Sequence, residues 1–471
     1  MSEAVVVGSG PNGLVCAAVL ASRGVGVTVI EAAATIGGGT RSAELTLPGL
    51  VHDVCSAVHP MAVGAPSMTS LGLERHGLEW AWPEVDLAHP LDGGDGAAMV
   101  RSIEQTAVGL GDAGAAWQRL FGAPSRRYEA VAEDFNKPLL RVPSHPLSLA
   151  RFGAVAALPA TAVARALPTP QARALFGGVA AHSFGKLSWP LSAAIGTAMI
   201  CAGHHTGWPV ARGGSQAIAD ALAGVIRENG GRVETGRPVR SLDELPSADA
   251  VVLDLAPAGV LEVAGDRLPS QVARAYRRYK HGPGSFKLDL AVEGGVPWEL
   301  EAARRAGTVH LSGSFEETAA AERDANRGRM PARPFVLVAQ QYLADPGRSR
   351  GDVHPVWAYA HVPHGYEGDA TEIVLDQIER FAPGLRDRIV ARASISPPEF
   401  AAANANYIGG DVITGSNTPR QMVVRPRLAL NPYATGISGV YICSAATPPG
   451  GGAHGMCGYN AAQAVLRELD G

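Results

Sequence analysis

Apolar and polar positions at the start of the chain predict a strand, a helix and a second strand. Residues 4–7 and 27–30 are short continuous apolar runs. Runs of this kind are typical of strands buried on both faces in a parallel sheet. Residues 12–22 between them predict a helix that ends near Gly24, a residue suited to a helix C-terminus. The segment therefore predicts a βαβ unit.

Similar elements return later, so we expect the chain to rejoin the first sheet after an insertion. The additional helices and strands of this sheet are predicted at residues 215–229, 232–235, 250–254, 440–444 and 459–469.

A strand of another kind is predicted at residues 285–292. There Phe286, Leu288 and Leu290 alternate with Lys287 and Asp289, which predicts one apolar and one polar face.

Composition narrows the class of protein. The 471 residues are 46% hydrophobic and 18% charged, typical of a globular enzyme with more than one domain. The net charge of -4, without a long basic stripe, argues against a nucleic-acid partner. The five cysteines are scattered and never spaced C-x-x-C, which disfavours a disulfide framework, a zinc ribbon and a dithiol centre.

We expect a cytoplasmic protein, since no signal peptide precedes the first strand and no apolar run reaches the length of a spanning helix. The apolar segment 147–167 is either an interfacial helix that contacts a membrane surface or a helix of the substrate domain, and we favour the second.

The turn after the first strand matches a dinucleotide-binding fingerprint, G-x-G-x-x-G. In this pattern the first glycine makes the tight turn, the second admits a pyrophosphate, and the third lets the helix pack closely. Glu31, at the end of the second strand, is placed to accept hydrogen bonds from ribose hydroxyls. The loop consists of Gly8, Ser9, Gly10, Pro11, Asn12 and Gly13.

A second glycine loop favours FAD over a nicotinamide cofactor. Gly38, Gly39, Thr40 and Arg41 follow Glu31 closely, and a nicotinamide dehydrogenase has no need for such a loop. An extended FAD runs past this turn, where an arginine can reach its phosphates. No later strand is followed by another G-x-G-x-x-G, which argues against a separate NAD(P)H domain.

A third glycine-rich loop, at residues 444–458, lies between the last strand and the last helix. The N-terminus of that helix can stabilise negative charge on a reduced flavin.

Several segments taken together resemble the phytoene-dehydrogenase-related FAD oxidoreductases. Within that group the chain is most similar to the branch of the pyridine-nucleotide-disulphide oxidoreductase domain 2 proteins, although it lacks the C-x-x-C of a disulfide reductase. The resemblance covers nearly the whole chain. It is carried by VVVGSGPNGL, IGGGTRS, HDVCSAVHP, GWPVARGGSQAIADAL, FKLDLAV and TPPGGGAHGMCGYNAA.

The resemblance implies an α/β fold with two domains built from discontinuous segments. A Rossmann-like FAD-binding domain is expected at residues 1–51, 210–256 and 405–471. An inserted α+β substrate domain with an antiparallel sheet is expected at residues 52–209 and 257–404, with a helical subdomain at about 100–205.

The resemblance also assigns cofactor contacts. The first glycine loop and Glu31 would hold the AMP half of FAD, the second loop would line the pyrophosphate, and Val239 would lie by the adenine. Gly455 and Met456 would contact the isoalloxazine ring, and Ala32 and Ser444 complete the expected set. Cys457 raises the question of a covalent flavin.

Two residues are candidates for catalysis. His59 is expected near the flavin, either as an acid–base group or as a structural histidine at a domain junction. Lys287 either points into the substrate cavity or pairs with Asp289 or Glu293. For His454 we favour a structural or flavin-contacting role. No histidine cluster has the partners of a metal site, and we predict none.

Three functions remain open. The first is hydride transfer on an apolar, polyene- or isoprenoid-like substrate, as desaturation, saturation or isomerisation. The second is amine oxidation, which a related architecture performs. The third is a flavin-bound protein with a non-catalytic interaction role. The sequence leaves the oligomeric state open.

Overall fold

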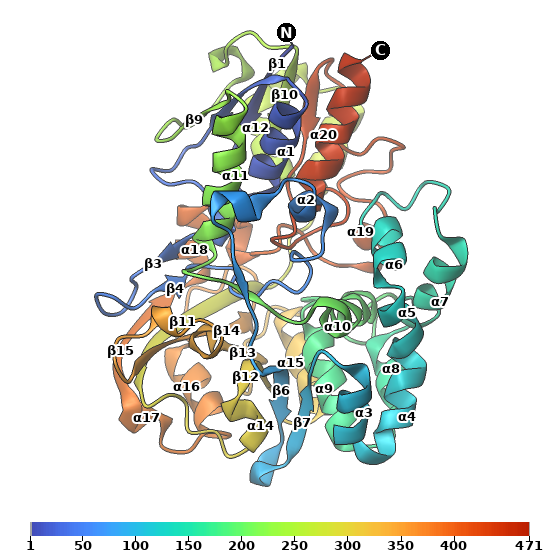
Figure 1. Cartoon of the computed structure of the whole chain (residues 1–471). Helices are drawn as coiled ribbons and strands as arrows, with labels where there is room; N and C mark the ends of the chain where they lie inside the picture. Colours follow the sequence, from blue (N-terminus) through green and yellow to red (C-terminus); the bar gives the residue numbers. More distant parts are fainter. Residues whose placement is uncertain (1, 471) are drawn as a thin grey trace.

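A five-stranded parallel sheet forms one half of the molecule, in the order β16-β10-β1-β2-β9 (Figure 1). The computed structural model describes residues 2–470. Four of the strands are short, largely apolar and buried, as their composition predicts, whereas the edge strand β9 is exposed to half-buried. Their bounds are β1 (Glu3–Val7), β2 (Gly26–Ile30), β9 (Arg232–Glu234), β10 (Ala250–Leu253) and β16 (Val440–Ile442).

Helices cover both faces of this sheet. One face packs against α1 (Pro11–Ser22), α11 (Gln216–Glu228) and α20 (Met456–Leu469). The opposite face packs against α12 (Pro257–Ala264) and α13 (Ser270–Arg277).

A seven-stranded sheet forms the core of the second half, in the order β15-β11-β14-β13-β12-β6-β7. Its pairs are antiparallel except for β6 and β12, which run parallel. The strands are β6 (Val85–Pro90), β7 (Gly96–Met99), β11 (Gly284–Glu293), β12 (Ala306–Leu311), β13 (Val336–Ala339), β14 (Val353–Val362) and β15 (Ile389–Ile395). The predicted α/β fold class, with a parallel sheet and a separate antiparallel sheet, is confirmed.

The alternation predicted for β11 separates two environments. Phe286, Leu288 and Leu290 lie in an apolar core that includes residues of α14 (Glu301–Arg304), α16 (Thr371–Glu379) and α17 (Leu385–Arg388). Lys287 and Asp289 lie on the other face of the sheet, which looks toward the interior between the two halves of the molecule.

Helices form a third region beside the second sheet (Figure 1). They are α3 (Ile103–Gly109), α4 (Gly114–Trp117), α5 (Ala123–Arg126), α6 (Tyr128–Phe135), α7 (Pro146–Ala156), α8 (Ala160–Arg165), α9 (Pro170–Ala181) and α10 (Ala194–Thr206). The remaining helices are α2 (Pro66–Thr69), α15 (Phe315–Ala325), α18 (Pro397–Ala403) and α19 (Pro419–Val423). Two small antiparallel pairs consist of β3 (Ser42–Ala43) with β4 (His52–Asp53) and of β5 (Trp80–Ala81) with β8 (Val210–Ala211).

The prediction of one helix at residues 147–167 is wrong. Residues 147–167 form two helices, α7 and α8, because Pro159 cannot continue a helix and instead precedes the first turn of α8. The last helix also begins earlier than predicted, at Met456, since Gly455 in the left-handed region (φ 66°) stands immediately before it. Among the described residues, no helix is long and apolar enough to cross a membrane.

Candidate functional site

The first glycine loop joins β1 to α1 at the carboxyl edge of the parallel sheet. Gly8 has a φ of 99°, a conformation that favours glycine. A Cβ on Gly13 would lie 2.2 Å from the backbone oxygen of Gly8, so only glycine lets α1 pack so closely on the loop. These contacts give two glycines of the fingerprint the steric roles expected of them.

The second glycine loop touches the first. A Cβ on Gly38 would lie 2.9 Å from Cα of Gly10, and the Thr40 hydroxyl closes the turn by donating to the Gly37 carbonyl at 2.8 Å. Gly39 and Thr40 line the same cavity as Gly10. The two loops, separated by about a helix and a strand in sequence, therefore form one continuous surface.

Glu31 ends β2 with both carboxylate oxygens engaged. It accepts the backbone N–H of Ser9 and of Ala33, each at 2.8 Å, and the Ser9 hydroxyl at 2.5 Å. Arg41 pairs with it at 3.5 Å and donates to the Thr35 carbonyl at 2.8 Å. The carboxylate thus fixes the glycine loop against the strand end, and its contact with a ribose stays a prediction.

A cavity of about 590 Å³ extends from the glycine loops into the second half of the molecule. Its volume is within the range of about 300–1,000 Å³ that is usual for ligand sites. Gly10, Pro11 and Asn12 lie at one end, and Lys287 and Trp357 of the seven-stranded sheet also line it.

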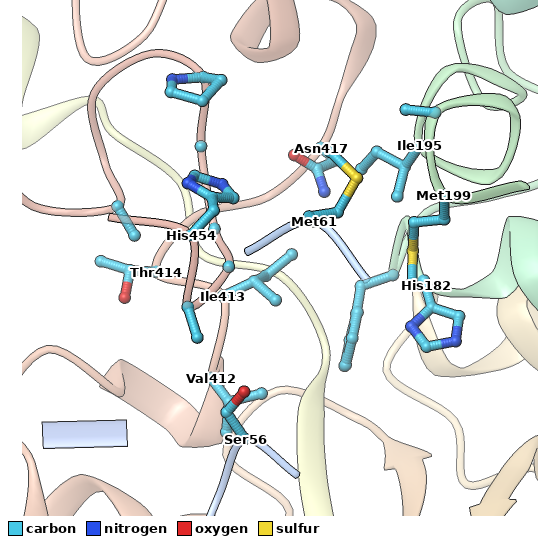
Figure 2. Close-up of a pocket in the computed structure, with 18 of the residues that line it drawn as sticks. Ser56, Met61, His182, Ile195, Met199, Val412, Ile413, Thr414, Asn417 and His454 are labelled. Atoms are coloured by element: carbon cyan, nitrogen blue, oxygen red, sulfur yellow. The ribbon is translucent and has the colours of Figure 1, made fainter. Parts of the chain in front are cut away.

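Most of the remaining wall is apolar. Figure 2 shows His454 and Thr414 on one side of this space and Met199 and His182 on the other. Apolar side chains of the wall include Met61, Phe135, Leu149, Phe152, Phe184, Leu191, Ile195, Met199, Leu337, Val412 and Ile413.

His59 lines the cavity and is buried, and its position near a flavin stays a prediction. Its Nε2 is 2.9 Å from the Ser215 hydroxyl, at the start of α11, and its Nδ1 has no partner. Burial lowers the pKa of His59 to about 4, so the imidazole is neutral at physiological pH. A neutral imidazole with one free nitrogen can accept or donate a single hydrogen bond.

Lys287 both lines the cavity and pairs with Asp289, the two alternatives considered for it. Its side chain lines the cavity, is fully buried and forms an ion pair with Asp289. Asp289 in turn lies 3.2 Å from Nδ1 of His52, and Lys287 Nζ lies 5.9 Å from the centroid of the Trp357 ring. The carboxylate of Asp289 therefore compensates the charge of Lys287.

The last glycine loop supplies another part of the wall. Residues 450–454 line the cavity, and Nδ1 of His454 accepts the N–H of Met456 at 3.1 Å. His454 thereby satisfies a donor of the first turn of α20. The Sγ of Cys457 is buried, 3.3 Å from the Gly450 carbonyl and 3.4 Å from that of Thr447, and is not part of the cavity wall.

Three further predicted contacts are not among the residues that line the cavity. Val239 packs, half-buried, in the apolar cluster under the parallel sheet. Ser444 is buried after β16, while Ala32 is exposed after β2. Their predicted contacts with the cofactor stay predictions.

Arg348, which the sequence did not single out, holds the junction of the two halves. Its guanidinium is buried and lies 2.6 Å from Asp53 and 3.1 Å from Asp345. Asp53 also accepts the N–H of Ser215 and the hydroxyl of Ser42. This cluster holds β4 and α11, beside the cavity wall, against the loop that follows β13.

The loop after α18 and the end of β10 also line the cavity. Asn404, Asn406 and Tyr407 come from that loop, and Asp254 directly follows β10. Of these, only Asp254 carried a usable signal in the sequence, since it is the last residue of the predicted strand 250–254, at the edge where ligands bind.

The buried histidines bond mainly to protein groups. His361 contacts Glu322 at 2.6 Å, His182 contacts His310 at 3.0 Å, and His204 accepts the indole N–H of Trp117 at 2.9 Å. Across residues 2–470, no group of three or more potential ligands is placed to hold a metal ion.

Comparison with known proteins agrees with this geometry. Residues 6–68 match the NAD(P)-binding Rossmann-like domain. The mouse pyridine nucleotide-disulfide oxidoreductase domain-containing protein 2 is 25% identical, over 99% of this chain and 94% of its own length. The resemblance is confirmed. The nucleotide-binding match and this relative together support an oxidoreductase with a flavin or nicotinamide-type cofactor.

Solved structures share the fold across the whole chain. An oxidoreductase from Methanosarcina mazei is 16% identical with a TM-score of 0.61, covering 99% of this chain and 100% of its own. Cyclohexylamine oxidase from Brevibacterium oxydans is 15% identical with a TM-score of 0.58, covering 100% of both chains.

Proposed function

We propose that the protein is an FAD-dependent oxidoreductase that transfers hydride to or from an apolar, polyene- or isoprenoid-like substrate. The observation that carries this proposal is the single cavity that joins the glycine loops to an apolar chamber. When bound, FAD supplies the hydride acceptor or donor at its isoalloxazine ring.

The residues at the glycine end suit a dinucleotide. Only glycine fits at Gly10 and Gly39, since a Cβ there would lie 2.6 Å from Asp254 and 2.2 Å from Tyr407, so both residues line the cavity without a side chain. The first backbone N–H groups of α1, which begins at Pro11, have no partner within the helix and are suited to bind phosphate.

The chamber residues would position the substrate and exclude water. Phe152, Ile195 and Met199 offer apolar contact, which favours a hydrocarbon substrate over a charged one. His59 is neutral and would orient a polar group or move one proton at Nδ1. The direction of the reaction is open, since desaturation, saturation and isomerisation place the same demands on this wall.

Amine oxidation is a second candidate, favoured by one observation. Lys287 comes from the substrate-domain sheet and lies in the cavity wall, and flavin amine oxidases that share this architecture hold a lysine near the flavin. Cyclohexylamine oxidase has the same fold. In this reading Lys287 would contact the substrate or an ordered water beside it.

Anaerobic flavin reduction separates the two candidates. We expect a panel of polyenes and isoprenoids to bleach the oxidised flavin spectrum or, with pre-reduced protein, to restore it, while primary and secondary amines leave it unchanged. Bleaching by an amine alone would overturn the hydride-transfer proposal. In that case Lys287→Met should slow reduction about 100-fold, whereas Lys280→Met, at an exposed lysine, should not.

Two residues of the cavity wall are exposed apolar side chains. Leu139 and Val423 line the cavity and are also exposed at 49% and 38%. Near Leu139 in sequence stand the exposed residues Leu140, Val142 and Leu147. We name the set of these five residues the apolar rim, and we propose that it contacts a membrane surface from which the substrate enters.

The rim predicts binding to lipid vesicles. Leu140→Ser, Val142→Ser and Leu147→Ser together should weaken co-sedimentation with phosphatidylcholine–phosphatidylglycerol vesicles at least about tenfold, because each removes apolar area from the contact. Val108→Ser and Val390→Ser, at exposed valines outside the rim, are the control. Equal binding by the rim variant and the control would contradict the proposal.

A further inference from the structure

Asp254 lies against the first glycine loop, between Gly8 and Gly13. It follows β10, the neighbour of β1, so its carboxyl emerges at the same edge as the glycine loop. Oδ2 accepts the N–H of Gly13 at 3.0 Å, and the side chain is 5% exposed. Added Cβ atoms on Gly8 and Gly10 would lie 3.1 Å and 2.6 Å from Asp254. The fingerprint glycines therefore make room for this carboxyl as well as for a cofactor.

No cation compensates this carboxyl. Within residues 2–470, no arginine, lysine or histidine forms an ion pair with Asp254. The groups that face it are the carboxylate of Glu31, the phenol of Tyr407 and the thiols of Cys443 and Cys457. Burial keeps the last three neutral by raising the pKa of each. Burial raises the pKa of Asp254 to about 7 against the opposing effect of hydrogen bonds from the N–H groups of Gly13 and Gly10, and the charge of Glu31 adds to the rise.

The pyrophosphate of the proposed FAD would lie beside Asp254, at the glycine end of the cavity. Asp254 lines the cavity beside Gly10, Pro11 and Asn12, at the N-terminus of α1. A pyrophosphate here would meet an ionised Asp254 with like-charge repulsion but would accept a hydrogen bond from a neutral one.

We propose that Asp254 binds the pyrophosphate of FAD as the neutral carboxylic acid, accepting from Gly13 through Oδ2 and donating its own O–H to a phosphate oxygen. Binding from alkaline solution then takes up one proton from water at this carboxyl, and release of FAD returns it. The inference rests on the proposed function, because it requires FAD at this edge of the sheet. It adds a binding residue that acts in only one protonation state.

Linkage gives the direction of the effect. As pH falls below the pKa of Asp254, which is about 7, the carboxyl of the free protein becomes neutral and FAD affinity levels off. Above pH 7 the proton must be taken up, so affinity falls about tenfold per pH unit until the pKa of the complex is reached. FAD itself carries no group that titrates near neutrality. A change of FAD affinity with pH in this range therefore comes from a group of the protein.

Calorimetry on the FAD-free protein tests the inference. At pH 8, titration with FAD in buffers of different ionisation enthalpy should show uptake of close to one proton, and at pH 6 close to none. Asp254→Asn should bind FAD with one affinity from pH 6 to pH 9 and without uptake. Asp249→Asn, the same change at the exposed opposite end of β10, should keep the wild-type slope.

Two results would overturn the inference while leaving the cofactor in place. They are a wild-type affinity that stays constant from pH 6 to pH 9 without proton uptake, and an Asp254→Asn variant that keeps the slope. The buffer series on the wild type needs no variant, so it decides the question even if Asp254→Asn does not fold. Failure of the wild type to bind FAD at any pH would contradict the proposed function itself.

Discussion

Gly13→Ala is expected to lose FAD binding and to destabilise the nucleotide-binding domain. Its Cβ would lie 2.2 Å from the Gly8 backbone oxygen and 3.1 Å from Cβ of Asp254, so backbone must move to admit it. Overpacking of this kind costs about 1–3 kcal/mol of unfolding free energy. The same displacement moves the loop that faces the pyrophosphate. We expect at least a tenfold lower FAD affinity, about 1.4 kcal/mol, by fluorescence titration.

Gly109→Ala is the matched control for this change. Gly109 lies in α3, and a Cβ there would meet nothing within 4 Å. Alanine should be neutral or stabilise the protein by up to about 1 kcal/mol, since it favours helix. Wild-type affinity and stability in Gly13→Ala would show that α1 does not pack on the loop as described.

Arg348→Met is expected to destabilise the protein by about 3–5 kcal/mol, because it leaves the Asp53 carboxylate buried without its cation. In the wild type, burial alone would raise the pKa of Asp53, but Arg348 and the hydrogen bonds of Ser215 and Ser42 hold it below its usual value. Urea unfolding at pH 7 measures the loss. Arg350→Met, at an exposed neighbour, should change stability by no more than about 0.5 kcal/mol.

The pH dependence of this loss gives a second measure. With its pKa lowered, Asp53 stabilises the wild type above its unfolded pKa, and this contribution is lost as pH falls through its folded pKa. In Arg348→Met the carboxyl can be neutral at higher pH than in the wild type. The difference in unfolding free energy should therefore shrink as pH falls from 7 toward 4. A difference that is absent at pH 7 would contradict the role given to Arg348.

The features that could be predicted from the sequence are those with a local signal. The glycine fingerprint and its flanking apolar runs placed β1, α1 and β2, because turn and packing geometry demand glycine at fixed offsets. The two-residue period at Phe286–Leu290 revealed both faces of β11, since successive side chains in a strand point to opposite sides.

The remaining features depend on residues that are distant in sequence. Asp254 and Gly13 are 241 positions apart, and Asp53 and Arg348 are 295 apart, so no window of sequence contains either pair. The predicted helix at 147–167 failed for a different reason. Its apolar composition outweighed Pro159 in the prediction, whereas in the structure the proline marks the boundary between α7 and α8.

The central claim is that the protein binds FAD, and one measurement tests it most directly. The purified protein should show the absorption spectrum of an oxidised flavin, either as isolated or after incubation with FAD. Acid precipitation should release FAD into the supernatant, since the buried thiol of Cys457 lies outside the cavity wall. A protein that stays colourless and takes up no FAD on reconstitution would contradict the claim.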